Sequence, residues 1–178
     1  KLYGLPNYIG NTALFYRSDW LDESGFSTPP DTFEDFLDVA KAFTKDLDGD
    51  GRDDRWGFGI LGAKSSSLPY RFYTFLFGFG GEIIEQAPEG KYIAAFNKPE
   101  GVTATQFYAD LANKYKVCPP GATEADFEAV TNQFANSQVG MFISGSWTIS
   151  GVLARNPDLE GKFSVCLPPK GVRRASIG

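Results

Sequence analysis

Segments with the apolar spacing of strands alternate along this chain with segments that have the spacing of helices. The strongest helical pattern covers residues 33–43, where apolar side chains recur every three or four positions, and Thr32 followed by Asp35 predicts its start. The clearest strand is predicted at 139–143, and others are predicted at 2–5, 12–17, 56–61, 92–96 and 163–167. Further helices are predicted at 18–25, 68–79, 99–115, 123–134 and 147–153. This alternation predicts an α/β architecture.

Composition narrows the class of protein. With 178 residues, 42% of them hydrophobic, the chain can bury one sizeable core or form one lobe of a larger protein. Acidic residues outnumber basic ones by 22 to 17, and no basic run exceeds the pair Arg173 and Arg174, which argues against a nucleic-acid surface. The absence of histidine excludes histidine-dependent triads and most zinc catalysis. Cys118 and Cys166 lack the spacing of a zinc site; a disulfide and two separate thiols are both open, the thiols being the commoner arrangement.

An apolar segment lies near each end of the chain. Residues 2–6 and 163–167 read as strands close to the termini, where an independent domain more often finishes in a polar segment. No apolar run reaches the length of a membrane-spanning helix, and no signal-peptide pattern follows Lys1. We therefore expect one lobe of a larger protein, which is either cytosolic or has lost a targeting segment.

Trp147 follows the predicted strand at 139–143, after a break at Gly145 and Ser146 that can cap the next helix. An aromatic ring at such a strand-to-helix corner tends to face a cleft, and its flat apolar face with one polar N–H suits a pyranose sugar. The alternative is that Trp147 fills the core, which is the commoner place for a tryptophan. Aromatic residues make up 15% of the chain and gather at 70–79, which favours a ring-lined site.

The segment 46–54 has the pattern of a calcium-binding loop, with carboxylates at alternate positions before a glycine. Its candidate ligands are Asp46, Asp48, Asp50, the Arg52 carbonyl and Asp54. The twelfth position, which should carry a bidentate glutamate, is Gly57. A structural calcium site and a plain turn rich in aspartate and glycine therefore both stay open.

Several short motifs occur along the chain in a specific order. They are Tyr3-Gly4-Leu5-Pro6, Leu14-Phe15-Tyr16 with Asp19 and Leu21, residues 30–36, 46–57 and 96–101, and Gly140-Met141-Phe142 with Gly145-Ser146-Trp147. In this order and spacing, the chain resembles over nearly its whole length the extracellular solute-binding proteins of sugar ABC importers, the group that includes maltose-binding protein.

The resemblance implies two α/β lobes that hold a ligand in the cleft between them and release it to a membrane transporter when they open. This chain would be a periplasmic-binding-protein-like (type II) lobe with a central mixed sheet flanked by helices. Residues 1–11 would be the first interlobe crossing, 12–164 the second lobe, and 165–178 the second crossing with the start of the return. The implied partners are a small carbohydrate and ABC importer membrane subunits, and the protein would be a monomer at the periplasmic or extracellular face, free or lipid-anchored. No cofactor is required, and calcium at 46–54 would be structural.

The resemblance also implies where the ligand binds. Family members stack aromatic rings on sugars at the positions of Trp147, Tyr70 and Tyr73, and their crossing segment meets the ligand at the positions of Asn7, Tyr8, Gly10 and Asn11. Tyr70 and Tyr73 are one helical turn apart and could share a face, with core packing as the alternative for each. Arg71 could pair a ligand acid or phosphate, although a solvated surface arginine is the commoner case.

These residues leave three classes of function open. A transport binding protein needs stacking rings and side chains that pair hydroxyls, and the chain has both. A carbohydrate-active enzyme needs two carboxylates across one bond, and the nearest candidates, Glu82 and Glu85, lie in a turn after a helix. A calcium-stabilised structural module would leave the aromatic excess unexplained. We therefore predict a carbohydrate-binding component of an ABC importer that has no enzymatic activity.

Overall fold

The computed structural model describes residue 5 and residues 10–177. The predicted strand at 2–5, Leu5 apart, and the predicted site residues Asn7 and Tyr8 lie outside the described residues. Within the described part of the chain, no helix has both the length and the apolar character needed to cross a membrane.

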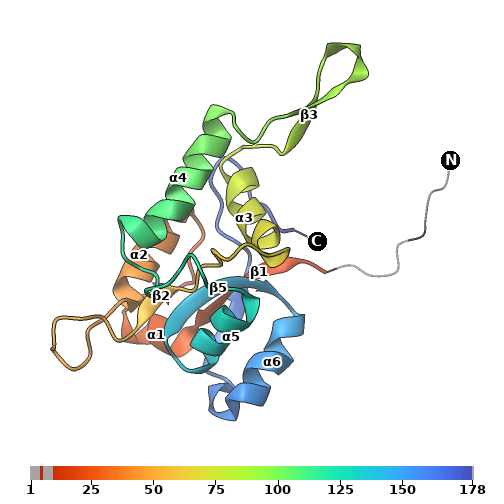
Figure 1. The fold of residues 1–178 in the computed structure, drawn as a ribbon. Coiled ribbons are helices and arrows are strands. Elements are labelled where there is room, and N and C mark those ends of the chain that lie inside the picture. Colours follow the sequence, from red (N-terminus) through yellow and green to blue (C-terminus); the bar gives the residue numbers. More distant parts are fainter. Residues whose placement is uncertain (1–4, 6–9, 178) are drawn as a thin grey trace.

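A four-stranded mixed sheet lies at the centre of the fold (Figure 1). Its strands, in spatial order, are β2 (Trp56–Phe58), β5 (Val139–Gly145), β1 (Thr12–Arg17) and β6 (Phe163–Cys166). β1 runs antiparallel to both β5 and β6, whereas β2 runs parallel to β5. Every residue of β5 is buried, because this strand lies inside the sheet and both of its faces are covered. The predicted α/β fold with a central mixed sheet is confirmed.

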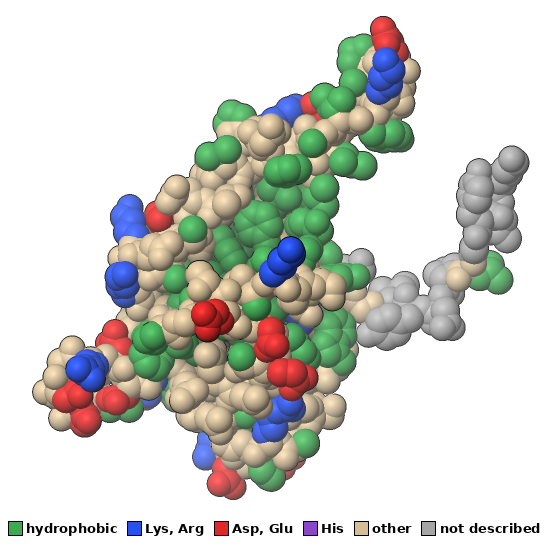
Figure 2. Space-filling view, viewed as in Figure 1, with side chains coloured by type: hydrophobic (Ala, Val, Ile, Leu, Met, Phe, Trp, Pro, Cys, Tyr) green, Lys and Arg blue, Asp and Glu red, His purple; other side chains and the backbone are tan. Residues whose placement is uncertain are grey.

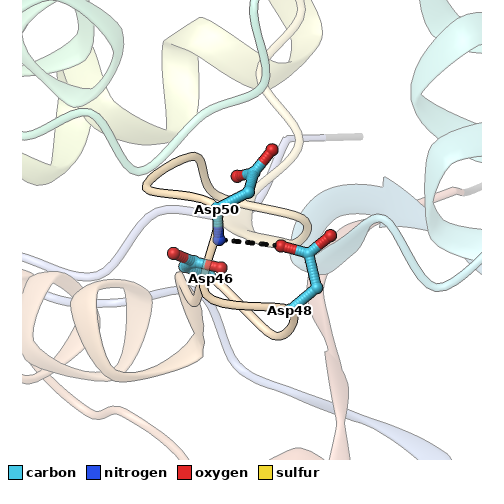
Figure 3. Close-up of side chains that lie close together, drawn as sticks. All are labelled: Asp46, Asp48 and Asp50. Atoms are coloured by element: carbon cyan, nitrogen blue, oxygen red, sulfur yellow. Dashed lines mark hydrogen bonds between the residues drawn. The ribbon is translucent and has the colours of Figure 1, made fainter.

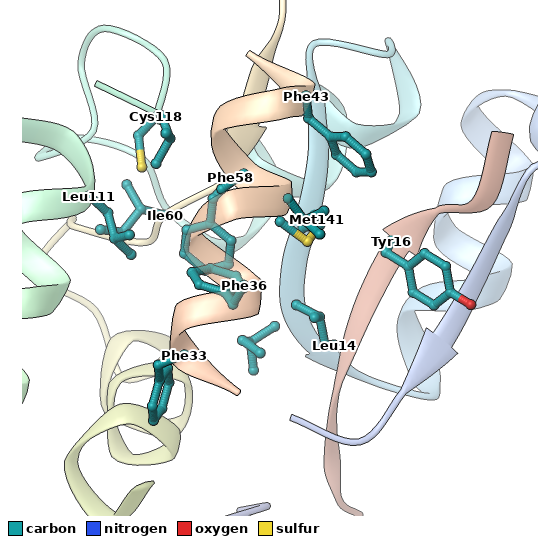
Figure 4. Close-up of a cluster of buried hydrophobic side chains, with 14 of the residues drawn as sticks. Leu14, Tyr16, Phe33, Phe36, Phe43, Phe58, Ile60, Leu111, Cys118 and Met141 are labelled. Carbon is teal, nitrogen blue, oxygen red and sulfur yellow. The ribbon is translucent and has the colours of Figure 1, made fainter. Parts of the chain in front are cut away.

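Helices cover the sheet and enclose two apolar cores. They are α1 (Ser18–Glu23), α2 (Phe33–Phe43), α3 (Ser67–Gly78), α4 (Pro99–Asn113), α5 (Phe127–Ala135) and α6 (Trp147–Arg155), with short 3-10 turns at Pro88–Gly90 and Pro157–Leu159. In one core, Met141 of β5 lies near Phe36 of α2 (Figure 4). In the other, Phe142 packs against Phe15 and Phe134, with ring centroids 5.0 and 4.7 Å apart. Successive residues of β5 therefore anchor opposite cores.

Capping side chains decide where two of the helices begin. α2 starts after Thr32, whose hydroxyl accepts the Asp35 N–H while the Asp35 carboxylate accepts the Thr32 N–H, both at 3.0 Å. This start was predicted and is confirmed. α5 starts at Phe127 instead of residue 123, because the Asp126 carboxylate accepts the Ala129 N–H at 2.8 Å and caps the helix there.

A separate hairpin stands away from the central sheet. β3 (Ile84–Gln86) pairs antiparallel with β4 (Tyr92–Ala94), and the two strands project from the body beyond α4 (Figure 1). The sequence predicts a strand at 92–96 but misses β3, whose three residues are too few to show a period. β2 is also short: it ends at Phe58, three residues before the predicted end.

Trp20 of α1 lies between two arginine side chains. The guanidinium carbons of Arg17 and Arg55 are 4.7 and 4.2 Å from the centroid of its ring. Glu23 accepts hydrogen bonds from Arg55 and Lys45, each at 2.8 Å, and these bonds lower the pKa of Glu23 to about 2. Together the contacts fasten α1 to the loop between α2 and β2.

The two cysteines are separate. Cys118 is buried, Cys166 is partly buried, and both are free thiols. Burial raises the pKa of Cys166 to about 11 and raises the pKa of Cys118 as well. Of the two arrangements that the sequence left open, the structure has the separate thiols.

Candidate functional site

Three segments that are far apart in the sequence meet at one end of the central sheet. Where β1 pairs with β5, Thr12 lies opposite Gly145. Because the strands are antiparallel, the residues before Thr12 and those after Gly145 leave the sheet at the same end. α3 reaches this end through Thr74, whose Oγ1 is 3.5 Å from the Oγ1 of Thr12. The candidate ligand-binding residues on these segments will be called the strand-end site: Asn11, Tyr70 and Trp147.

Trp147 is the first residue of α6 and remains 43% exposed. Its ring lies flat against the backbone of Gly145, since a methyl group placed on Gly145 would be only 2.1 Å from ring carbons Cζ3 and Cη2. Ser146 occupies the N-cap position of α6 but makes no side-chain capping bond, so the predicted cap is absent. The alternative that Trp147 fills the core is excluded, because almost half of the residue faces outward.

Tyr70 and Tyr73 both lie on α3, but they have different surroundings. Tyr70 is 49% exposed. Tyr73 is only partly exposed, packs 5.8 Å from the ring of Phe77, and lines a hollow between α3 and α4 that Tyr70 does not line. Tyr73 therefore borders the hollow, whereas Tyr70 does not, and the role of both residues in ligand binding stays a prediction.

Arg71 is buried, with 5% of its surface exposed. Its guanidinium donates hydrogen bonds to the backbone carbonyls of Ile143 and Ser67, at 3.4 and 3.2 Å, and to the Ser144 hydroxyl at 3.1 Å. Burial lowers the pKa of Arg71. The expectation of a solvated surface arginine is wrong, because the side chain reaches inward to β5. Its predicted contact with a ligand gains no support from these bonds, which point into the protein.

Two predicted site residues of the first crossing segment, Gly10 and Asn11, are among the described residues. Asn11 is exposed immediately before β1, and Gly10 is half-buried. An exposed amide can both donate and accept hydrogen bonds, which is what sugar hydroxyls require. Asn11 can therefore serve as a polar partner for a ligand at this end of the sheet.

The hollow between α3 and α4 is large. Its volume is about 1200 Å³, and apolar side chains gather along it in the space-filling view (Figure 2). Leu68, Phe72 and Tyr73 line it from α3, and Tyr108 lines it from α4. Sequence reasoning did not identify this hollow, although the concentration of aromatic residues at 70–79 was its signal.

The acidic loop holds three carboxylates close together. Oxygen atoms of Asp46, Asp48 and Asp50 lie within 4.8 Å of one another (Figure 3). Asp46 accepts the N–H groups of Gly49 and Gly51 at 2.6 and 2.8 Å, and these bonds lower the pKa of Asp46. The loop thus has the converging carboxylates that calcium requires and also a set of internal bonds that hold it as a turn.

The remaining predicted ligands of the loop lie differently. Asp54 accepts the Leu47 N–H at 2.6 Å and does not belong to the group of three carboxylates, while Arg52 is exposed. Calcium binding stays a prediction.

The two carboxylates considered for an enzyme do not face each other across a cleft. Glu82 pairs with Arg173, and Glu85 pairs with Lys98, in two surface ion pairs. A glycosidase needs one protonated and one ionised carboxyl group on either side of the bond that is cleaved. These two glutamates do not provide that arrangement.

Comparisons with known proteins were made for the whole chain. The model of the bacterial extracellular solute-binding protein family matches residues 1–176. A binding protein of Brucella abortus is 27% identical over 172 residues, and the match covers 96% of this chain and 38% of that protein. The galactooligosaccharide-binding protein of Bacillus subtilis is 28% identical over 152 residues, covering 84% of this chain and 33% of that protein.

Among solved structures, an ABC transporter solute-binding protein from Thermotoga lettingae bound with α-D-tagatose superposes with a TM-score of 0.84 at 34% identity. This match covers 98% of the chain and 43% of that protein. The chain thus spans about two fifths of the length of the proteins it matches.

Proposed function

The chain belongs to the bacterial extracellular solute-binding protein family, and from that premise we propose that it is one lobe of a carbohydrate-binding protein of an ABC importer. The family consists of extracellular binding proteins of transporters and not of enzymes. The sugar-binding descriptions of the Bacillus subtilis relative and the Thermotoga lettingae structure support a carbohydrate as the solute. Delivery of that solute to the membrane subunits of an importer is part of the proposal.

The pair of half-exposed rings in the strand-end site carries this proposal. Tyr70 and Trp147 come from different elements, and each exposes nearly half of its surface. Sugar faces are patches of C–H bonds and their edges are hydroxyls, so a sugar site needs flat rings with polar groups beside them. Asn11 supplies such a group at the start of β1. The exposed parts of both rings are available to a ligand that a second lobe would cover.

The second proposed crossing adjoins Thr12, the residue that follows the first. The Ile177 N–H donates to the Thr12 hydroxyl, and the Thr12 N–H donates to the Ile177 carbonyl, both at 2.9 Å. We assign residues 1–11 and 165–178 to the crossings and 12–164 to the lobe. Adjacent crossings can act as one hinge, and ligand binding then shifts a pre-existing equilibrium between open and closed forms.

Nothing in this mechanism requires a cofactor, because stacking and hydrogen bonding suffice. We expect a monomer at the periplasmic or extracellular face of the membrane. Calcium at Asp46, Asp48 and Asp50 would only stabilise the α2–β2 loop, and it is tested separately below.

The test is a fluorescence titration of the parent protein that contains this chain, with both lobes present. Mono- and oligosaccharides, polyols and glycerol phosphate form the panel, and the Trp147→Phe variant assigns the signal. We expect a saturable change with one class of compound and a smaller change in the variant. Silence across the panel with a folded protein would overturn the carbohydrate proposal, and a response that is unchanged in the variant would remove Trp147 from the site.

A further inference from the structure

Arg71 carries a buried positive charge that is satisfied by neutral oxygen atoms. Its three hydrogen bonds go to the Ile143 and Ser67 carbonyls and the Ser144 hydroxyl, and no carboxylate among the described residues forms a salt bridge with it. Its guanidinium carbon also lies 4.9 Å from the centroid of the Phe127 ring. A buried charge is expensive to desolvate, and an apolar side chain of similar volume often stabilises a fold as well or better. Stability alone therefore does not account for an arginine here.

The bonds of Arg71 lead directly to the residues around Trp147. The Ser144 hydroxyl, which accepts from Arg71 Nη2, is 2.7 Å from the hydroxyl of Thr148. Ser144 precedes the Gly145 backbone on which the Trp147 ring lies, and Thr148 follows Trp147 in α6. Ser144 is 0% exposed and Thr148 is 1% exposed, so water does not compete for these bonds. The corner that carries Trp147 is thus held on both sides.

The same side chain is bonded to the helix that carries Tyr70. Arg71 follows Tyr70 on α3, and its Nη1 donates to the Ser67 carbonyl in the first turn of that helix. Ser66, at the N-cap position of α3, makes no side-chain capping bond. The described polar links between the start of α3 and the end of β5 run through Arg71.

We propose that Arg71 is a positioning residue, whose buried guanidinium ties α3 to the end of β5 and so holds the Tyr70 and Trp147 rings in one binding surface. A rigid fork of donors suits this role, because it can meet acceptors on two elements at once. The inference rests on the proposed function, since it concerns the geometry of the strand-end site.

The experiment labels the parent protein with 5-fluorotryptophan and records its ¹⁹F NMR spectrum without ligand. The resonance of Trp147 is identified by its loss in Trp147→Phe. Three variants weaken the network: Arg71→Met removes all of the donors, Arg71→Lys keeps the charge but not the fork, and Ser144→Ala removes one link. Thr44→Val is the control, because Thr44 accepts the Gly57 N–H at 2.9 Å and donates to Ala40 at 2.9 Å, in the connection from α2 to β2.

We expect Arg71→Met and Ser144→Ala to shift or broaden the Trp147 resonance while the resonances of Trp20 and Trp56 stay in place. Arg71→Lys should restore part of the wild-type spectrum, and Thr44→Val should leave the Trp147 resonance unchanged. Because the two groups share one bond, the double variant Arg71→Met with Ser144→Ala should change the resonance by less than the sum of the single changes. If Arg71→Met does not fold, Ser144→Ala decides. A folded variant with an unmoved Trp147 resonance, or one in which the Trp20 and Trp56 resonances move as much as that of Trp147, would overturn the inference.

The same variants are then titrated with the panel used for the parent protein. We expect Arg71→Met to weaken binding about tenfold for any compound that Trp147→Phe also weakens. A compound that binds equally well to wild type and Trp147→Phe would contradict the proposed site, whereas the spectra still decide the role of Arg71. Loss of affinity in Trp147→Phe but not in Arg71→Met would contradict the positioning role alone.

Discussion

Replacing Gly145 with alanine should displace the Trp147 ring without unfolding the lobe. The added methyl group would lie 2.1 Å from two ring carbons, whereas carbon atoms pack at about 3.5–4.0 Å, so the ring must retreat by roughly 1.5 Å. The backbone of Gly145 does not have a positive φ, so alanine brings no conformational strain there. A displaced ring loses most of its stacking contact, which is worth about 1–2 kcal/mol. We expect the Kd for the ligand to rise roughly five- to thirtyfold.

Alanine substitutions at two other glycines serve as controls for this measurement. A methyl group on Gly151 of α6 would meet only Arg155, at 3.3 Å, so Gly151→Ala should leave binding unchanged and stabilise the helix by about 0.5–1 kcal/mol. A methyl group on Gly140 would lie 2.2 Å from Phe43 in the core, so Gly140→Ala should lower the free energy of unfolding. Urea unfolding and calorimetric titration of the three variants separate the effects. The reasoning fails if Gly145→Ala binds like wild type, or if it loses as much stability as Gly140→Ala.

Four further predictions address other parts of the molecule. Trp147→Ala should weaken binding by about 1–3 kcal/mol with a small change in unfolding midpoint, and an unchanged calorimetric Kd would contradict this. The folded-state pKa of Glu23 is depressed from 4.5 to about 2, so its stabilising effect is present above pH 4.5 and disappears as the pH falls toward 2. Because the Glu23 side chain is half-exposed, the effect is about 1 kcal/mol or less. Glu23→Gln should therefore flatten the plot of urea stability against pH in that range. Without a closing glutamate, the acidic loop should bind calcium with a Kd of about 1 mM. At 1 mM, Ca²⁺ should then stabilise the protein by about 0.4 kcal/mol and raise its melting temperature, and Asp48→Asn should abolish this rise. An unchanged melting temperature at 10 mM Ca²⁺ would reject the site. In the native protein at pH 8, Cys166 should react slowly with a thiol reagent and Cys118 not at all, whereas rapid labelling of both would contradict their burial.

The parts of the fold that the sequence predicted are those with a strong local signal. The stripe of apolar residues at 33–43 and its cap at Thr32 identify α2, and the apolar run at 139–143 identifies β5. β3 was missed because its pairing with β4 comes from contacts between segments and leaves no period in three residues. The start of α5 was placed too early because the competing cap at Asp126 was not recognised.

The candidate site shows the same division between local and long-range information. Trp147 could be identified because the break that ends the strand before it, at Gly145 and Ser146, lies within two positions of it. Arg71 could not be understood locally, because its partners Ile143 and Ser144 are more than seventy residues away along the chain. Arginine is usually solvated, and only the tertiary structure shows that this one is enclosed. Helical spacing likewise suggested a shared face for Tyr70 and Tyr73, and only the tertiary structure shows that Tyr73 packs near Phe77 and lines the hollow between α3 and α4.

Size alone would favour the hollow between α3 and α4 over the strand-end site as the place where a sugar binds. Chemistry argues the other way. The hollow is lined mainly by apolar side chains, and the hydroxyl of Tyr108 inside it already donates to the Leu61 carbonyl at 2.8 Å. A sugar placed there would meet mostly apolar side chains, with Arg52, Asp53, Asn113 and Lys116 among its few polar partners. Each hydroxyl left unpaired would be costly to bury. In the strand-end site the half-exposed rings of Tyr70 and Trp147 offer stacking faces, and the exposed Asn11 offers a group that can pair with hydroxyls. We therefore expect a polyhydroxylated solute to bind at the strand-end site and not in the hollow.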